Sequence, residues 1–328
     1  MRAVFLSCGG DVFIASLVIK LFKERWYSEV DKFWVCYNNH SGVPKEVAGE
    51  FLRNLTQEPK IEIIYHRSGV GNGRPITEMT LISREDLVML IEDDGFLFES
   101  GLVNKYFQMI ESDLTDIVGS PRGSCGQEIW ERSKELYHLD YSGYGDVGPN
   151  FWPNFFFCKR SDLLKTDLNF ASKSFAIGEY CRELDYTFKE VNHGDTFVWA
   201  CMQLKALGLR FHSVPQHHAD PYEIENKQKE QMNWHETQKP FGWLHGGSLS
   251  ASWGGYLSGA VPTAKDDSSL REMETRCALW RIASETTEGF DDFKIEYRKG
   301  IDNLIKNAFL DSGNIHKKYL IYKNLMRI

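Results

Sequence analysis

From residue 87 to residue 96 the chain reads Leu87-Val88-Met89-Leu90-Ile91-Glu92-Asp93-Asp94-Gly95-Phe96, an apolar run that ends in three acidic residues. The apolar run predicts a buried strand. Because burial of unpaired carboxylates is costly, we expect the strand to deliver its acids to an edge where they meet a cation or water. In open α/β sheets, ligands bind at the carboxyl ends of the strands. The stretch therefore predicts a ligand-binding edge, and a solvated acidic turn is the alternative.

Short apolar runs alternate with helical patterns on both sides of this stretch, which is typical of βα units that feed a mostly parallel sheet. The expected strands of this first part of the chain span residues 3–6, 33–37, 61–65, 87–91 and 116–119. Apolar residues at helical spacing predict helices over 12–22 and 47–55, and Ser100 is the expected N-cap of a third helix. The expected fold class is α/β, with a Rossmann-like, mostly parallel sheet flanked by helices.

The remainder of the chain has less regular patterns. Residues 121–194 are rich in glycine, aromatic and turn residues, with one clear strand at 154–158. A helix is expected from Asp195 to Gly208, followed by a strand over 209–214. Further on, a polar segment predicts a mobile loop and the last part predicts two or three amphipathic helices. These two segments are residues 222–239 and 266–328.

Composition excludes several classes of protein. The net charge of −8 and the pI near 5.7 argue against a broad nucleic-acid-binding face, which needs clustered Lys and Arg. The seven cysteines form no CxxC pair, so their spacing suggests neither a disulfide framework nor a zinc site. No apolar run approaches the roughly 18–20 residues of a membrane helix, and the apolar start is too short for a signal peptide. We therefore expect a reducing compartment and a cytoplasmic location.

The apolar strand followed by Glu92-Asp93-Asp94 resembles the DxD motif of GT-A glycosyltransferases, in a spelling similar to that of the N-acetylglucosaminyltransferase I family. In GT-A enzymes the last acid coordinates a divalent metal, and an earlier acid contacts the ribose or the metal. The resemblance implies Asp94 as a metal ligand, with Glu92 and Asp93 beside it against the nucleotide sugar. Mg²⁺ or Mn²⁺ suits such carboxylates together with phosphate oxygens.

Residues 194–215 resemble the acid-led helix, glycine and proline-terminated strand of inverting family 2 glycosyltransferases. In that family the acid is the general base for the acceptor hydroxyl, which implies this role for Asp195. The family usually has Glu where this chain has Gly194, so half of the motif is missing. The competing interpretation is that Asp195 caps the helix and needs no chemistry.

Asn72-Gly73-Arg74 occupies the place of an Asn-x-Gly stretch that lies against the nucleotide in family 2 relatives. Glycine lets the backbone approach a ligand closely, and an Arg can pair with a diphosphate. The ends of the first two predicted strands are where the base and ribose are expected. The nucleotide-sugar-binding residues implied there are Ser7, Cys8, Gly9 and Asn38.

A late histidine usually completes the metal site in these families, and the chain offers two candidates. The pair His217-His218 has the favoured spacing from Asp195, whereas His245 begins a His-Gly-Gly-Ser sequence that looks more like the family's pattern. We prefer His245 and keep His218. Trp152 precedes the predicted strand at 154–158 and is expected to stack on a sugar-like acceptor, with a core position as the equal alternative.

The resemblance implies a GT-A glycosyltransferase domain over residues 1–265. The amphipathic pattern of residues 266–328 predicts a C-terminal helical appendage, which resembles no known family. Within the domain, 1–120 would bind the nucleotide sugar, and 121–265 would bind the acceptor and carry a mobile loop at 219–244. The expected reaction is inverting, metal-dependent transfer of a hexose-type sugar from a nucleoside diphosphate, UDP first, to an acceptor hydroxyl. A glycan, protein, lipid, small molecule or modified DNA remains open as acceptor.

Two rival functions share these features. A sugar-phosphate nucleotidyltransferase has a similar start, but its glycine-rich loop after the first strand normally carries Arg and Lys, and Ser7-Cys8-Gly9-Gly10-Asp11 has neither. A GT-A domain that binds a nucleotide sugar without turning it over would explain the missing Glu before Asp195.

Overall fold

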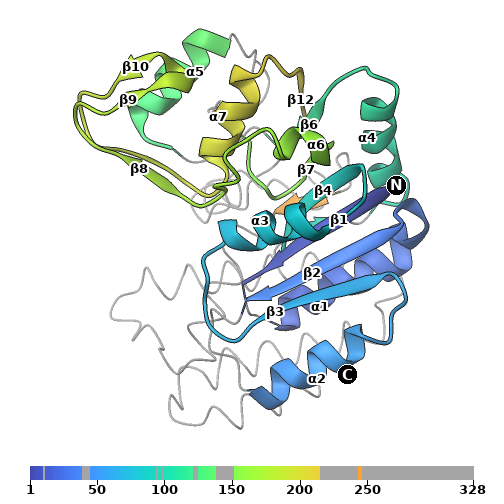
Figure 1. Cartoon of the computed structure of the whole chain (residues 1–328). Helices are drawn as coiled ribbons and strands as arrows, with labels where there is room; N and C mark the ends of the chain where they lie inside the picture. Colours follow the sequence, from blue (N-terminus) through green and yellow to red (C-terminus); the bar gives the residue numbers. More distant parts are fainter. Residues whose placement is uncertain are drawn as a thin grey trace, which may run out of the picture.

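The computed structural model describes residues 1–9, 12–38, 45–93, 95–97, 99–120, 125–137, 151–214 and 243–245. A seven-stranded sheet with the order β12-β6-β7-β4-β1-β2-β3 runs through the molecule (Figure 1). Its strands are β1 (Arg2–Cys8), β2 (Lys32–Asn38), β3 (Ile61–His66), β4 (Leu87–Glu92), β6 (Ile117–Gly119), β7 (Phe156–Lys159) and β12 (Phe211–Ser213). Each corresponds to one predicted strand, so the predicted α/β fold with a mostly parallel sheet is confirmed. The helical appendage predicted over 266–328 lies outside the described residues.

The connectivity of the sheet reverses direction beside β1. Strand β1 pairs in parallel with both β2 and β4, and β2 pairs in parallel with β3. The chain therefore moves from β1 to β3 on one side and then crosses to β4 on the other. Beyond β4, strand β7 is antiparallel to both of its neighbours, and β6 and β12 run parallel to each other. The crevice at β1 and β4 is thus the topological switch point, where ligands bind in open α/β sheets.

Helices cover both faces of the sheet, which explains why its central strands are apolar throughout. Side chains alternate along a strand, so Val4 and Leu6 face one way and Ala3 and Phe5 the other. The first face packs against α1 (Val12–Leu21), α2 (Lys45–Leu55) and α4 (Leu102–Glu111). The second packs against α3 (Gly73–Ile82), α6 (Arg160–Leu163) and α7 (Val198–Ala206).

A smaller body of structure, here called the α5 lobe, lies at the opposite end of the molecule from β3 (Figure 1). It consists of α5 (Gln127–Tyr137), β8 (Lys173–Phe175), β9 (Tyr180–Cys181), η3 (Arg182–Leu184), β10 (Tyr186–Thr187) and β11 (Asn192–Gly194). Its core includes Ile129 and Phe175, which pack with Trp199 and Met202 of α7. Helix α7 is therefore apolar on both sides, because it lies between the sheet and the α5 lobe.

Two predicted helix starts are wrong. Helix α4 begins at Leu102 with Gly101 as N-cap, at φ +85°, so Ser100 is not the cap. The carboxylate of Glu29 accepts hydrogen bonds from the N–H groups of Gly101 and Asn104 and replaces the expected capping hydroxyl. Helix α7 begins at Val198 rather than next to Asp195, as described below.

The predicted loop over 219–244 also needs a correction at its end. Residues Trp243–His245 form strand β13, which pairs antiparallel with β5 (Gly95–Leu97). The rest of that loop lies outside the described residues. In the part of the chain that the structure describes, every helix is too short or too polar to cross a bilayer.

Candidate functional site

The first two acids of the triplet, Glu92 and Asp93, lie at the topological switch point. Strands β1 and β4 are in register, with Leu6 opposite Ile91 and Ser7 opposite Glu92, so both strands end at the same edge. Glu92 is partly exposed there, and Asp94 itself lies outside the described residues. Of the two described acids, Glu92 is thus partly exposed at the sheet edge and Asp93 is buried behind it.

Asp93 ties the ends of the two strands together. Its side chain is buried, and its Oδ2 accepts a hydrogen bond of 2.7 Å from the N–H of Gly9. Its own N–H donates to the carbonyl oxygen of Ser7 at 3.1 Å. Asp93 thus fixes the backbone that follows β1 against the backbone that follows β4. A ligand at this edge would meet a preorganised turn.

His245 is brought next to the triplet by strand pairing. In the β13–β5 ladder, His245 is opposite Gly95, the residue that directly follows Asp94. The strand is anchored by Trp243, which is buried and stacks on Phe155 with ring centroids 4.1 Å apart. The backbone register therefore places this candidate beside the acids, while His218 lies outside the described residues.

Gly95 makes this crowded turn fit. A Cβ at this position would lie 2.1 Å from Oδ1 of Asn154, a residue that is itself fully buried. The sequence did not mark Asn154 as part of the site, because it stands in an aromatic stretch far from residue 95. Its amide packs directly beneath the turn that carries the triplet.

Asn38 ends β2 at the same edge and is 1% exposed. Its Oδ1 accepts a hydrogen bond from the N–H of Val70 at 3.0 Å, which holds the loop before α3 against the sheet. Its Nδ2 has no hydrogen-bond partner among the described residues. A buried amide donor without a partner is costly, so this group is suited to donate to a ligand at the strand ends.

The Asn72-Gly73-Arg74 stretch starts α3. Its glycine was expected to let the backbone approach a nucleotide, but in the structure it packs against the backbone of another segment. A Cβ on Gly73 would lie 2.1 Å from the backbone nitrogen of Ala171. The close approach is therefore to the chain itself. Asn72 is exposed and makes no side-chain cap, and Nε of Arg74 donates to Glu78 at 2.8 Å.

Asp195 follows β11 and is exposed. Its Oδ1 accepts a hydrogen bond of 2.7 Å from the N–H of Thr196, and no other side-chain bond or ion pair of Asp195 occurs within the described ranges. Phe197, in the left-handed conformation at φ +72°, is the N-cap of α7. Asp195 therefore does not cap the helix with its side chain, whereas its carbonyl oxygen accepts a hydrogen bond from the N–H of Val198 at 3.1 Å.

One chain segment connects the start of α7 to the start of α3. The N–H of Phe197 donates to the carbonyl oxygen of Phe170 at 2.8 Å, and the two rings stack. Ala171, the next residue, is the one that Gly73 contacts. The candidate base and the candidate nucleotide-binding stretch thus flank residues 170–171, although they are more than a hundred residues apart in sequence.

Trp152 lies near the carboxyl end of β6, where its backbone N–H donates to the carbonyl oxygen of Ser120 at 3.3 Å. Strand β6 runs parallel to β4, since both are antiparallel to β7. Trp152 therefore lies at the same edge of the sheet as the acidic triplet. The residue is partly exposed.

Comparisons with known proteins give no match in sequence and distant matches in structure. No protein-family model and no curated protein matches the chain. The crystal structure of S. aureus TarS 1-349 is similar at 9% identity and a TM-score of 0.44, covering 100% of this chain and 90% of that one. Its complex with UDP gives 9% identity, a TM-score of 0.40 and coverages of 99% and 89%. The crystal structure of HddC from Yersinia pseudotuberculosis is similar at 12% identity and a TM-score of 0.32, covering 51% of this chain and 80% of that one.

TarS is a glycosyltransferase. At these identities and TM-scores the similarity bears on neither the ligands nor the activity of this chain. The fold assignment therefore rests on the topology of the sheet.

Proposed function

We propose that this chain is a glycosyltransferase that moves a sugar from a nucleoside diphosphate, with UDP as the first candidate, to an acceptor hydroxyl. The observation that carries the proposal is the position of Glu92 and Asp93 at the switch point between β1 and β4. The resemblance of Glu92-Asp93-Asp94 to the DxD motif implies that these acids bind a divalent metal and a nucleotide sugar. Neither feature alone would distinguish a nucleotide-sugar site from other metal-dependent sites.

A divalent cation bound among the acids at this edge is part of the proposal. Glu92 is partly exposed at the strand end, and the His245 backbone lies opposite Gly95. Because Oδ2 of Asp93 already accepts from Gly9, we assign Asp94 and His245 as the ligands of Mn²⁺ or Mg²⁺. When bound, the ion would offset the negative charge of the leaving diphosphate.

The nucleotide would lie along the ends of β1 and β2. The buried amide nitrogen of Asn38 is suited to an acceptor atom of the base or ribose. Arg74 is largely exposed, and its Nε contact to Glu78 leaves the outer guanidinium nitrogens to pair with a diphosphate. Ser7 and Cys8, which are buried, would shape the floor of this site rather than donate to it.

Asp195 would act as the general base. It would take the proton of the acceptor hydroxyl while that oxygen forms a bond to the anomeric carbon, and the bond from this carbon to the diphosphate oxygen would break with inversion. The exposed carboxylate after β11 supports this role, as does the link through Phe170 to the start of α3. Trp152 at the same edge would stack on the acceptor.

The test is hydrolysis and transfer measured with a panel of nucleotide sugars, with and without Mn²⁺. We expect release of the nucleoside diphosphate only with the ion. Binding without release would support a non-catalytic domain instead, for which there is one specific observation. A Cβ on Gly194 would lie 3.0 Å from Cγ1 of Val198, so the Glu usual at this position would be crowded. Pyrophosphate release from a sugar phosphate and a nucleoside triphosphate would indicate the nucleotidyltransferase.

A further inference from the structure

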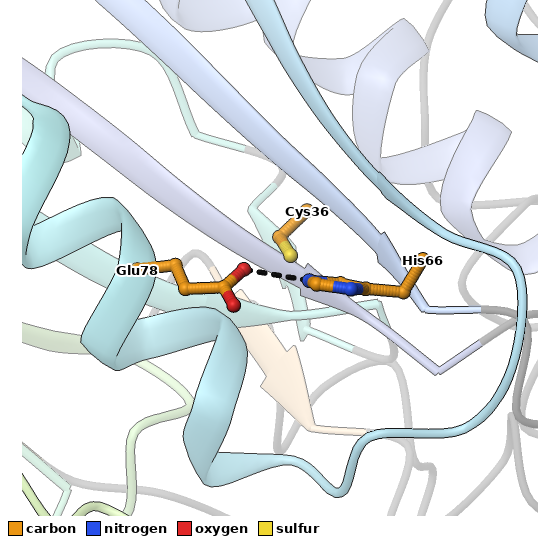
Figure 2. Close-up of side chains that lie close together, drawn as sticks. All are labelled: Cys36, His66 and Glu78. Atoms are coloured by element: carbon orange, nitrogen blue, oxygen red, sulfur yellow. Dashed lines mark hydrogen bonds and ion pairs between the residues drawn. The ribbon is translucent and has the colours of Figure 1, made fainter.

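Three side chains of different chemistry converge on the sheet face that α3 covers: Cys36 of β2, His66 at the end of β3 and Glu78 of α3 (Figure 2). Their sulfur, ring nitrogen and carboxylate oxygen all lie within 4.8 Å of one another. Within the described ranges this is the one group of three or more such side chains close enough to share an ion. The group is separate from Glu92, the last residue of β4, and from Asp93, which follows it.

The fold brings these residues together by strand register and helix packing. Strands β2 and β3 are parallel, with Cys36 opposite Ile64 and Asn38 opposite His66. The chain then returns over the sheet as α3, whose Ile76 and Met79 pack in the same apolar cluster as Cys36. No local spacing in the sequence reveals the group, since its members come from three different elements.

The carboxylate of Glu78 is already oriented by a second residue. Its Oε2 lies 2.6 Å from Nε2 of His66, and its Oε1 accepts a hydrogen bond of 2.8 Å from Nε of Arg74. A bound ion would replace the contact between His66 and Oε2, while Arg74 would keep holding Oε1. An outer partner of this kind commonly orients a metal-ligating carboxylate.

Burial of Cys36 makes its thiol unreactive without a cation. The side chain is fully buried, and burial together with the nearby charge of Glu78 raises the pKa of the thiol to about 12. It therefore stays protonated at neutral pH and is a poor nucleophile. Burial also tends to raise the pKa of Glu78, but hydrogen bonds from Arg74 and His66 outweigh it, so that pKa is lowered and the carboxylate stays charged.

We propose that Cys36, His66 and Glu78 form a Zn²⁺ site with a fourth position open to water. A soft thiolate, an imidazole and a carboxylate are the three donor types that Zn²⁺ combines, and Mg²⁺ does not take thiolate. One thiolate and one carboxylate would balance the +2 charge. His66 and Glu78 are 16% and 26% exposed, which gives an ion and a water access to the site.

The geometry needs only small movements. Tetrahedral Zn²⁺ with ordinary bond lengths separates its ligand atoms by about 3.3–3.6 Å. The present contact between His66 and Glu78 would widen from 2.6 Å, and the sulfur would move inward from within 4.8 Å. Bonds from zinc to sulfur, nitrogen and oxygen would form, and the thiol proton would leave to solvent. Neutral His66 would keep its proton on Nδ1.

The test is titration of the metal-stripped full-length chain with Co²⁺, which reports thiolate ligation through a sulfur-to-cobalt charge-transfer absorption. We expect about one equivalent of Co²⁺ to give this band and Zn²⁺ to abolish it. Cys36→Ser should lose the band. Cys158→Ser is the matched control, because Cys158 is equally buried in the same sheet, and it should keep the band. Arg74→Gln should weaken Co²⁺ binding by about 10–100-fold.

Two further variants keep the outcomes distinct. His66→Gln changes a partly exposed side chain, so it decides the matter if Cys36→Ser does not fold. Asp94→Ala should leave the band unchanged, because this site does not depend on the proposed function. The proposal is overturned if no thiolate band forms, or if the band survives in folded Cys36→Ser or His66→Gln.

Discussion

The switch-point edge of the sheet and the α5 lobe are held together in different ways. At the edge, β1, β2 and β4 are long, buried strands in register, and side-chain contacts such as that of Asp93 only join their ends. In the α5 lobe the strands have two or three residues, and one carboxylate organises them. That carboxylate, Glu128, accepts hydrogen bonds from the Tyr186 hydroxyl, the N–H groups of Lys189 and Glu190, and Nδ2 of Asn192.

This difference indicates which region is rigid and which can open locally. A ligand at the edge meets backbone fixed by burial of apolar residues, which tolerates little movement. The α5 lobe depends on individual hydrogen bonds, so single substitutions should open it locally without unfolding the sheet. Asp195 lies between the two regions, after the last strand of the lobe and before α7.

The largest effect is expected from Asp94→Ala, which tests the claim that catalysis depends on the acidic residues at the switch-point edge of the sheet. Removal of a ligand from a site with few carboxylates leaves the diphosphate charge uncompensated, so turnover should disappear. Sugar transfer with added Mn²⁺ measures this. Undiminished turnover in excess chelator would refute the metal site.

Asp195→Asn separates chemistry from structure at the junction of the two regions. An amide cannot take a proton, so transfer should fall by about 10²–10⁴-fold. The amide oxygen can still accept from Thr196, so the melting temperature and donor affinity should stay unchanged. Transfer at nearly the parent rate would redirect the search for a base to Glu179, Glu183, Asp185 or Glu190.

Gly73→Ala tests the contact that joins α3 to the segment before α7. The new Cβ would meet the backbone of Phe170 and Ala171, which cannot rotate away, so we expect a loss of about 1–3 kcal/mol or more in the free energy of unfolding. Gly49→Ala in α2 is the control, because its Cβ would meet only the end of Arg53 at 3.4 Å. That variant should be neutral or slightly stabilising. Equal melting curves for both variants would contradict the packing.

Asn192→Ala tests whether the α5 lobe opens on its own. Asn192 is buried, and its Oδ1 accepts from the N–H groups of Glu128 and Ile129. Loss of these bonds should cost about 1–3 kcal/mol locally. Amide hydrogen exchange should speed up in α5, β8 and β11 and remain slow in β1 and β4. Uniform faster exchange would show that the two regions unfold together.

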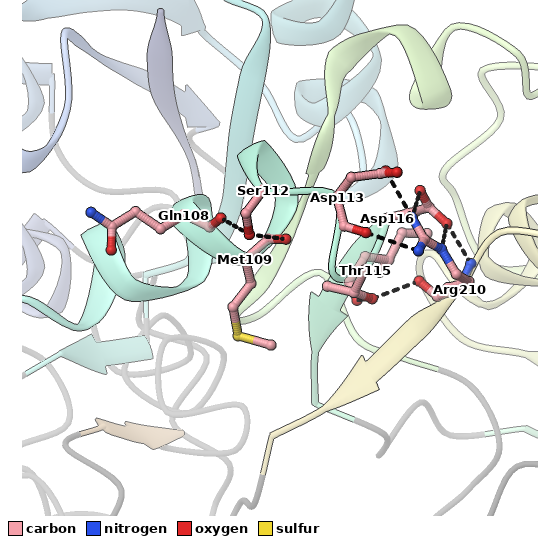
Figure 3. A network of polar contacts seen from close by, with 8 residues as sticks. Gln108, Met109, Ser112, Asp113, Thr115, Asp116 and Arg210 are labelled. Atoms are coloured by element: carbon pink, nitrogen blue, oxygen red, sulfur yellow. Dashed lines mark hydrogen bonds and ion pairs between the residues drawn. The ribbon is translucent and has the colours of Figure 1, made fainter.

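The smallest effect is expected at the outer edge of the sheet, where Arg210 joins β12 to β6 (Figure 3). Its guanidinium makes two contacts with the carboxylate of Asp116, of 2.9 and 3.1 Å, and two with Asp113, of 2.9 Å to the carbonyl oxygen and 2.8 Å to the carboxylate. The group is exposed, so Asp116→Asn should lower the melting temperature by only about 1–3 °C at pH 7.

The pH dependence of this pair follows from its pKa shift. The hydrogen bond from Arg210 lowers the pKa of Asp116. A carboxyl whose folded pKa is depressed stabilises the fold above its unfolded pKa of about 4, and the contribution is lost as pH falls through the folded pKa. The melting difference between parent and Asp116→Asn should therefore shrink below about pH 4. A gap that grows with acid would contradict the ion pair.

The sequence predicted the seven strands because apolar runs that are buried on both faces are visible without any knowledge of their partners. It also predicted the edge at which the acidic triplet lies. Helix α5 was not predicted, since only Ile129 and Ser133 of its residues are buried and most others are polar. The start of α7 was misplaced, because no local pattern shows that Phe197 adopts a left-handed conformation.

Contacts between distant segments could not be predicted in the same way. Asn154 beneath Gly95, Ala171 against Gly73 and the group of Cys36, His66 and Glu78 all depend on how strands and helices pack. The absence of a CxxC pair even argued against a zinc site, because such a motif reports only on ligands that are close in sequence. The sequence predicted the sheet edge that holds the acidic residues. Only the packing shows why Gly73 and Gly95 cannot carry a side chain.

The central claim is that a nucleotide sugar and a divalent ion bind together at the ends of β1 and β4. It is tested most directly by a crystal grown with UDP and Mn²⁺ and an anomalous difference map. We predict one manganese peak within bonding distance of Asp94 and His245, in contact with the diphosphate, with the base near Asn38. Nucleotide density elsewhere, or a manganese peak away from this edge, would contradict the account.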